Sequence, residues 1–177
     1  MKNKVILITG ALTGIGRATA LAFAREGAHL VVCGRRDDVG NALATELRAL
    51  GVEAEYIRAD VRHEDDVRSL VDKTVKRFGR LDVAVNTAGT EGKPGPVMEQ
   101  SPENYATTFD TNVLGTLLSL KHELRKSQMD PAFVEGGKLL VRVHLEQAQF
   151  YVRECAPISL DERRQDRSRG SAEKADA

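Results

Sequence analysis

The chain has 177 residues, of which 26 are basic and 26 acidic, so its formal net charge is zero. This balance gives no electrostatic reason to expect a nucleic-acid partner, and no apolar run approaches the roughly 18 residues of a membrane-spanning helix. Two cysteines are too few for a disulfide framework. The sequence therefore predicts one ordinary cytoplasmic domain without a membrane span.

Apolar runs typical of strands buried on both faces alternate with segments of helical periodicity. The expected strands, in chain order, are Lys4–Ile8, Ala28–Cys33, Glu53–Ala59 and Leu81–Val85. The expected helices are Gly14–Glu26, Val39–Leu50, Glu64–Phe78 and Asn104–Arg125. Strands that alternate with helices form parallel sheets joined by right-handed crossovers. The predicted fold class is therefore α/β, with a doubly wound parallel sheet.

The alternation ends after about Arg125. The run Lys138–Val143 is a candidate fifth strand, and Asp161–Ala177 has no large apolar side chain. Such a segment cannot bury enough surface to offset the entropy lost on ordering. We therefore expect a nucleotide-binding domain over residues 1–143 and a divergent, charged tail over residues 144–177.

A glycine-rich turn follows the first expected strand and leads directly into a helix. Glycines allow backbone to approach a phosphate closely, and a helix N-terminus presents free N–H groups to an anion. The spacing differs from G-x-G-x-x-G, so the context of the turn carries the prediction. The alternative is a tight strand-to-helix turn without a ligand. The candidate cofactor-binding residues here are Thr9, Gly10, Thr13, Gly14, Ile15 and Gly16.

Two arginines, Arg35 and Arg36, follow the second expected strand. In dinucleotide-binding sheets a carboxylate at this position suits the ribose of NAD, whereas arginine suits the 2′-phosphate of NADP. These residues therefore favour NADP over NAD. Alternatively, both arginines flank a helix start and face water.

Asp60 and Val61 follow the third strand. A carboxylate at the C-terminal end of a parallel strand faces the ligand crevice, where it can accept a hydrogen bond from an adenine amino group. An N-cap role for the next helix is equally compatible with an aspartate.

Small and amide side chains follow the fourth strand, among them Asn86, Ala88 and Gly89. The small residues allow the backbone to approach a cofactor, and the Asn86 amide can tie neighbouring strand ends together. Asn112 is a polar amide in an otherwise apolar helical stretch, so it requires a partner, either locally or as part of a site.

Together these motifs resemble the short-chain dehydrogenase/reductase family over roughly Lys4 to Leu124. The resemblance implies a Rossmann-type sheet, binding of NAD(P)(H), and hydride transfer with a small alcohol or carbonyl substrate. It also implies that Asn86 and Gly89 lie beside the nicotinamide ribose and that Asn112 organises a proton-relaying water. The family commonly dimerises through the helix around Asn112–Arg125, so a homo-oligomer is possible. No metal site is expected.

The catalytic serine, tyrosine and lysine of the family have no complete counterpart here. Tyr151 falls near the position of the family tyrosine, but Cys155 stands four residues later where lysine is required to lower the tyrosine pKa. No serine follows Leu139–Val143 directly. Tyr151 is the candidate catalytic residue beside Asn112, with simple packing against Phe150 as the alternative.

These departures lead to three hypotheses. The chain is an oxidoreductase of this type with an incomplete catalytic motif and a C-terminally incomplete sheet. Alternatively, it is a non-catalytic dinucleotide-binding protein, or an inactive truncated or frame-changed product.

Overall fold

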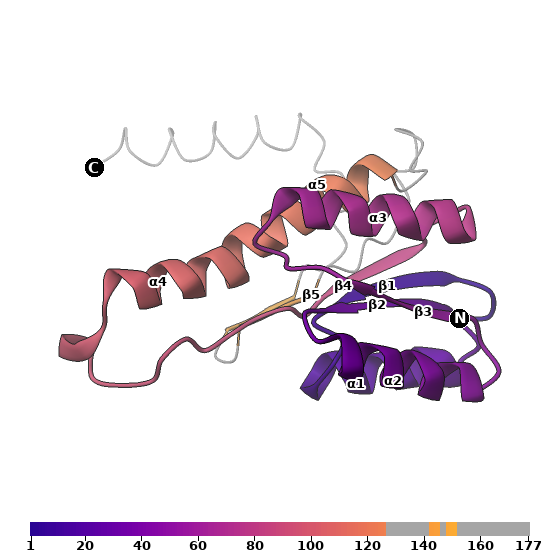
Figure 1. Cartoon of the computed structure of the whole chain (residues 1–177), viewed down its shortest axis with the longest axis horizontal. Helices are drawn as coiled ribbons and strands as arrows, with labels where there is room; N and C mark the ends of the chain where they lie inside the picture. The colour runs from indigo at the N-terminus through magenta and orange to yellow at the C-terminus, as the bar shows by residue number, and fades with distance from the viewer. Residues whose placement is uncertain (127–141, 146–147, 152–177) are drawn as a thin grey trace, which may run out of the picture.

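The computed structural model describes residues 1–126, 142–145 and 148–151. Four strands form a parallel sheet in the order β3-β2-β1-β4 (Figure 1). The strand order reverses direction at β1, because β2 pairs with one of its edges and β4 with the other. The strands of this sheet are β1 (Val5–Thr9), β2 (His29–Gly34), β3 (Ala54–Arg58) and β4 (Val83–Asn86).

Three helices follow the first three strands and cover both faces of the sheet. They are α1 (Gly14–Arg25), α2 (Asp37–Ala49) and α3 (Glu64–Phe78). Helices α1 and α2 lie on one face, and α3 lies on the other beside α5 (Gly115–Lys126) (Figure 1). The expected helices and strands up to β4 are thus present, with bounds that differ by a few residues.

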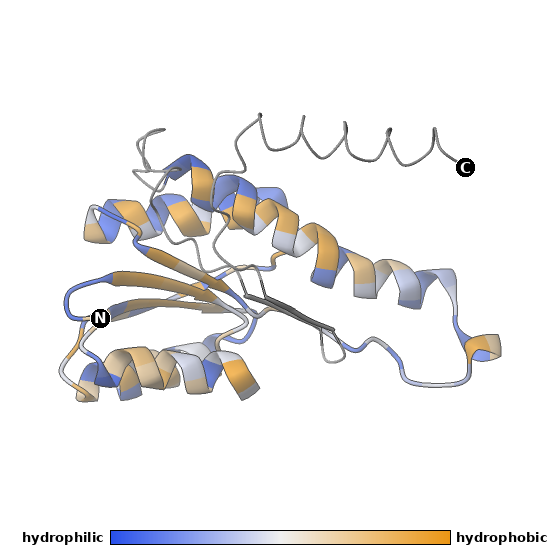
Figure 2. Cartoon of the chain, turned by 180° about the vertical axis from the view of Figure 1, so that it is seen from behind, coloured by the Kyte–Doolittle hydropathy of each residue, from blue (hydrophilic) through white to orange (hydrophobic). Residues whose placement is uncertain are grey.

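The side chains of the strands alternate between two apolar layers. Ile6 and Ile8 pack toward α1 and α2, whereas Leu7 packs with Leu70 and Val71 of α3. Period-two alternation puts successive residues on opposite faces, and both faces of this sheet are covered. The central strands β1 and β2 are accordingly apolar over most of their length (Figure 2).

The long helix expected over Asn104–Arg125 is divided by a π-helical segment. The helix α4 (Pro102–Phe109) leads into the π segment η2 (Asp110–Leu114), which continues as α5. A short 3-10 turn, η1 (Val97–Glu99), precedes α4. Helix α4 and η1 extend away from the sheet as an arm (Figure 1). The uniform α-helix predicted here is therefore wrong at Asp110–Leu114.

The fifth strand expected over Lys138–Val143 does not extend the parallel sheet in the part of it that is described. Arg142 and Val143 belong to β5 (Arg142–Leu145), which pairs antiparallel with β6 (Ala148–Tyr151) in a separate two-stranded sheet. Residues 138–141 lie outside the described range. Most of the predicted charged tail, residues 144–177, lies there too.

Candidate functional site

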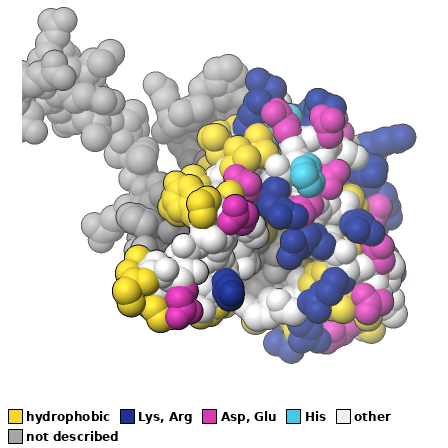
Figure 3. Space-filling view, turned by 60° about the vertical axis from the view of Figure 1, so that its left-hand side comes forward, with side chains coloured by type: hydrophobic (Ala, Val, Ile, Leu, Met, Phe, Trp, Pro, Cys, Tyr) yellow, Lys and Arg dark blue, Asp and Glu magenta, His cyan; other side chains and the backbone are white. Residues whose placement is uncertain are grey.

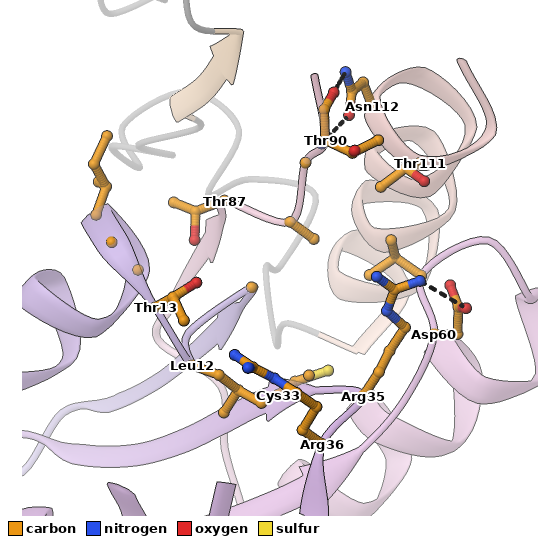
Figure 4. A pocket seen from close by; sticks show the side chains of 18 of the residues that line it. Leu12, Thr13, Cys33, Arg35, Arg36, Asp60, Thr87, Thr90, Thr111 and Asn112 are labelled. Atoms are coloured by element: carbon orange, nitrogen blue, oxygen red, sulfur yellow. Dashed lines mark hydrogen bonds and ion pairs between the residues drawn. The ribbon is translucent and has the colours of Figure 1, made fainter. Parts of the chain in front are cut away.

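A cleft of about 900 Å³ opens at the C-terminal ends of the four parallel strands. This edge of an open α/β sheet, at the point where strand order reverses, is where ligands bind. Figure 4 shows Arg35 and Arg36 toward one end of the cleft and Thr90 and Asn112 toward the other. Of the predicted cofactor residues, those that line the cleft are Gly10, Thr13, Gly14, Ile15, Gly16, Arg35, Arg36, Asp60, Val61, Ala88 and Gly89.

The glycine turn leaves the N-terminus of α1 without an internal cap. Thr13 occupies the N-cap position but its side chain makes no capping hydrogen bond, and the first turn of α1 holds no acidic residue. By contrast, the first turn of α3 holds Glu64, Asp65 and Asp66. Free N–H groups and the positive end of the helix dipole favour an anion at α1.

The turn packs directly on the segment that follows β4. Gly10 has φ +68°, and a Cβ there would lie 2.5 Å from the backbone nitrogen of Ala88. Only glycine adopts this conformation readily and leaves room for that approach. The glycine turn and the residues after β4 therefore form one continuous wall of the cleft.

Thr9 and Asn86 are the two predicted cofactor residues that do not line the cleft. Both are buried, and the Thr9 hydroxyl donates to Asn86 Oδ1 over 3.0 Å. The Asn86 Nδ2 group donates to Glu123 Oε2 on α5 over 2.9 Å. These residues hold the ends of β1 and β4 together beneath the cleft, which is the tie predicted for the Asn86 amide.

Asp60 lies at the rim, clamped by a neighbouring arginine. Arg62 Nε donates to Asp60 Oδ1 over 3.0 Å, and Arg62 Nη2 donates to Asp60 Oδ2 over 2.6 Å. These hydrogen bonds hold the pKa of Asp60 below its usual value. Arg35 Nη1 lies 3.8 Å from the same carboxylate (Figure 4). Asp60 is not the N-cap of α3, because His63 occupies that position.

Asn112 belongs to the π segment and faces the cleft. Its Oδ1 accepts from the Thr90 backbone N–H over 2.9 Å, and its Nδ2 donates to the Thr90 carbonyl over 2.8 Å (Figure 4). This paired contact fixes the loop after β4 against the long helix. π segments are frequent at functional sites, which is consistent with the position of Asn112.

Sequence reasoning missed several residues of the site. Cys33, Thr87 and Thr90 line the cleft, and each lies at or just beyond the end of a strand. Burial raises the pKa of the Cys33 thiol to about 12, so that this thiol is neutral at physiological pH. The position of these residues after strands could have identified them. Glu123, a carboxylate buried on α5, gave no signal in a helix that reads as amphipathic.

The structure describes only the backbone of Tyr151. This residue ends β6 and pairs with Arg142 of β5. Its side chain and Cys155 lie outside what the structure describes, so the catalytic role of Tyr151 stays a prediction.

A family model for short chain dehydrogenase matches residues 4–134. The chain belongs to the short-chain dehydrogenase family. Tropinone reductase-like 1 of Erythroxylum coca is 42% identical over 128 residues, which are 71% of this chain and 46% of that protein. L-fucose dehydrogenase of Oryctolagus cuniculus is 43% identical over 114 residues, which are 64% of this chain and 39% of that protein.

Solved structures of a dehydrogenase and a reductase share the fold of this chain. NAD+-bound xylitol dehydrogenase superposes with a TM-score of 0.71 at 31% identity, over 79% of this chain and 52% of that one. The NADH-dependent reductase A1-R′ complexed with NAD superposes with a TM-score of 0.66 at 32% identity. The match covers 71% of this chain and 52% of that one. The chain spans about half the length of these relatives, or less.

Two features are absent from the residues that the structure describes. No helix among them is long and apolar enough to cross the membrane. Within the same ranges, no group of three or more His, Cys, Asp or Glu side chains could hold a metal ion.

Proposed function

We propose that this chain binds a nicotinamide adenine dinucleotide in the cleft, with the 2′-phosphorylated form preferred, as the cofactor-binding part of an alcohol or carbonyl oxidoreductase. The uncapped N-terminus of α1 behind the glycine turn carries this proposal. Two solved structures to which the chain is similar contain bound NAD, which supports the same cofactor class.

The cleft residues suit successive parts of such a cofactor. The first turn of α1 suits the pyrophosphate, and the Asp60 carboxylate suits the adenine amino group. Asn112 and the Thr90 backbone line the other end, which suits the nicotinamide and its ribose. When bound, the cofactor supplies or accepts a hydride at its nicotinamide ring. The protein's part at this end is to hold the backbone rigid through the Asn112–Thr90 pair.

The preference for NADP rests on Arg35 and Arg36, which line the cleft. A charge-assisted hydrogen bond contributes about 1.5–3 kcal/mol, so Arg36→Ala and Arg35→Ala should each weaken NADPH binding roughly ten- to a hundredfold. Binding of NADH, which lacks the phosphate, should change little. Fluorescence titration of both reduced cofactors measures this difference.

Arg58 provides the matched control. It lies at the end of β3 and pairs with Asp37 over 3.1 Å, but does not line the cleft. Arg58→Ala should leave both affinities unchanged. Equal losses of NADPH and NADH affinity in the Arg35 and Arg36 variants would contradict a 2′-phosphate contact.

The residues expected to catalyse hydride transfer match the family incompletely, because Cys155 stands four residues after Tyr151, where the family has lysine. A tyrosine without a nearby cation titrates near 10 and is a poor base at neutral pH. We therefore expect little or no steady-state reduction of a carbonyl panel by NADPH. Tyr151→Phe should not change any residual rate. A large loss of rate in this variant would establish Tyr151 as the catalytic residue.

A non-catalytic dinucleotide-binding protein is the second candidate function, favoured by the same replacement at Cys155. Saturable cofactor binding without turnover would support it. Turnover of any alcohol or carbonyl substrate would favour the oxidoreductase.

We also propose that the chain self-associates through the long helix. Tyr105, Phe109, Val113 and Leu117 are four residues apart and 61%, 46%, 53% and 60% exposed. They form an apolar stripe along α4, η2 and α5. Figure 3 shows that hydrophobic side chains gather on one part of the molecular surface. In an antiparallel pair of these helices, Glu103 near one end would lie close to Arg125 near the other, so the stripe is electrostatically self-complementary.

Phe109→Asp should shift the chain toward monomer. Phe109 stacks on Tyr105 of the same chain and is 46% exposed in the stripe, so pairing of two stripes would bury a charge placed at this position. Sedimentation velocity would detect the shift. Leu50→Asp, at the exposed C-cap position that follows α2, is the control. An unchanged sedimentation coefficient for Phe109→Asp would rule out this interface.

A further inference from the structure

A buried chain of hydrogen bonds runs beneath the cleft from β1 to α5. The Thr9 hydroxyl donates to Asn86 Oδ1, and Asn86 Nδ2 donates to Glu123 Oε2. The exposed fractions of Thr9, Asn86 and Glu123 are only 1%, 6% and 4%. The second oxygen of the Glu123 carboxylate is buried without a hydrogen-bond partner. A carboxylate held in this way is costly, because each buried polar atom without a partner raises the free energy of the folded state.

This chain determines the position of the cleft floor. Thr9 and Asn86 are the last residues of β1 and β4, and the residues that follow them, Gly10 and Thr87, line the cleft. The Thr87 N–H and hydroxyl both donate to the Thr9 carbonyl, over 3.2 and 2.6 Å. A shift of Asn86 relative to Thr9 would therefore move the segment after β4 relative to the glycine turn that packs on it.

The Asn86 amide is oriented by Glu123. An ionised carboxylate only accepts hydrogen bonds, so it requires the amide NH2 group to face α5 and leaves Oδ1 for Thr9. A protonated carboxyl group can also donate a hydrogen bond. It therefore tolerates the opposite orientation of the Asn86 amide, in which Oδ1 faces α5. Ionised Glu123 thus selects a single orientation of the Asn86 amide, the one that leaves Oδ1 to accept from Thr9.

We propose that Glu123 is a positioning residue for the cofactor: through Asn86 it fixes the ends of β1 and β4 beneath the glycine turn. This proposal rests on the proposed cofactor-binding function of the cleft. Glu123 does not line the cleft, so its effect on the cofactor is transmitted through the hydrogen bond from the Asn86 amide.

The surroundings of Glu123 make it the group that titrates. Burial raises the pKa of Glu123 to about 7, against a smaller opposing effect of the Asn86 hydrogen bond. The charged groups between α5 and α3 are already paired, Glu64 with Lys121 and His122, and Asp72 with Lys126. Strand β4 holds no titratable side chain. Cofactor affinity should therefore rise as Glu123 ionises through neutral pH.

The test is the pH profile of NADH affinity between pH 6 and 8.5. NADH is the probe because it lacks the 2′-phosphate, which itself titrates near pH 6. The wild-type chain should bind NADH about three- to tenfold more tightly at pH 8.5 than at pH 6. Glu123→Gln should give a flat profile, and Glu123→Ala should bind several-fold more weakly throughout. Ser119→Ala, which removes a buried hydroxyl oxygen on α5 that also has no hydrogen-bond partner, should keep the wild-type profile.

NMR separates this proposal from the cofactor-binding function. In the wild-type chain without cofactor, the Asn86 side-chain amide and the Gly10 and Thr87 backbone amides should shift together near pH 7. The shifts should be absent in Glu123→Gln. A wild-type pH profile in Glu123→Gln, or no titration of the Asn86 amide, would overturn the positioning role. Absence of NADH binding with the NMR titration intact would overturn only the cofactor-binding function.

Discussion

Gly16→Ala should weaken binding of either reduced cofactor on the order of 100-fold, or about 2.7 kcal/mol. A Cβ at residue 16 would lie 2.3 Å from the Gly10 carbonyl oxygen and 2.7 Å from Thr87 Oγ1. The nearest of these atoms is backbone and cannot rotate away, so the turn must move relative to the wall of the cleft. Overpacking of this kind costs typically 1–3 kcal/mol and would displace the N–H groups of α1. Titration of NADPH and NADH fluorescence measures the loss.

Gly51→Ala is the matched control for this substitution. Gly51 follows α2 with φ +86°, and a Cβ there would meet nothing within 4 Å. The variant should lose about 1 kcal/mol of stability from the left-handed backbone and keep its cofactor affinity. Undiminished binding by a folded Gly16→Ala would show that the cofactor does not lie on the glycine turn.

Glu123→Gln should stabilise the chain at pH 8 by about 2–3 kcal/mol and have little effect at pH 5. The pKa of Glu123 rises from 4.5 to about 7 on folding, because burial disfavours the charged carboxylate. Between pH 4.5 and about pH 7, Glu123 is therefore more often protonated in the folded chain than in the unfolded chain. The free energy of unfolding of the wild-type chain therefore falls as pH rises through this range and levels off above pH 7. A glutamine has no charge to bury, so this contribution disappears in the variant.

Urea unfolding at pH 5 and at pH 8 checks this expectation. Glu99→Gln is the control, because Glu99 is an exposed glutamate in η1. Its unfolding curves should match those of the wild-type chain at both pH values. An equal stability difference between Glu123→Gln and wild type at pH 5 and pH 8 would contradict a titrating buried carboxylate.

The two effects predicted for Glu123 oppose each other. Ionisation costs folding free energy and, under our proposal, orders the floor of the cleft. A strained or poorly solvated group that is kept near a binding site is a common compromise between stability and function. Stability and cofactor affinity should therefore change in opposite directions with pH in the wild-type chain.

Local patterns in the sequence predicted the sheet and its binding edge. Alternation of apolar and helical periods predicted β1 to β4, and the position of Thr9–Gly16 after the first strand predicted a glycine turn at the N-terminus of α1. Asp60 and Ala88 line the cleft because the C-terminal ends of parallel strands meet at one edge. Each of these inferences needed only the residue types and their order.

Features that depend on packing between distant segments were not predicted. The π segment at Asp110–Leu114 leaves no mark in apolar periodicity, and the Asn112–Thr90 pair joins residues 22 apart. Glu123 reads as a solvated helical charge until α5 is packed against β4. The fifth strand was assigned from the apolar run Lys138–Val143, but periodicity does not specify a strand's partner. Arg142 and Val143 pair with β6 instead.

NMR mapping of NADPH onto the chain is the most direct test of the central claim. The backbone amides of Gly10, Gly14, Gly16, Ala88 and Gly89 should shift on titration, together with the side chains of Arg35 and Arg36. These residues line a single cleft at the ends of the parallel strands. Titration with NADH should shift the same glycine amides and leave the arginine side chains largely unchanged. Saturable binding with shifts elsewhere, or no shifts at the glycine turn, would contradict the assignment of this cleft as the dinucleotide site.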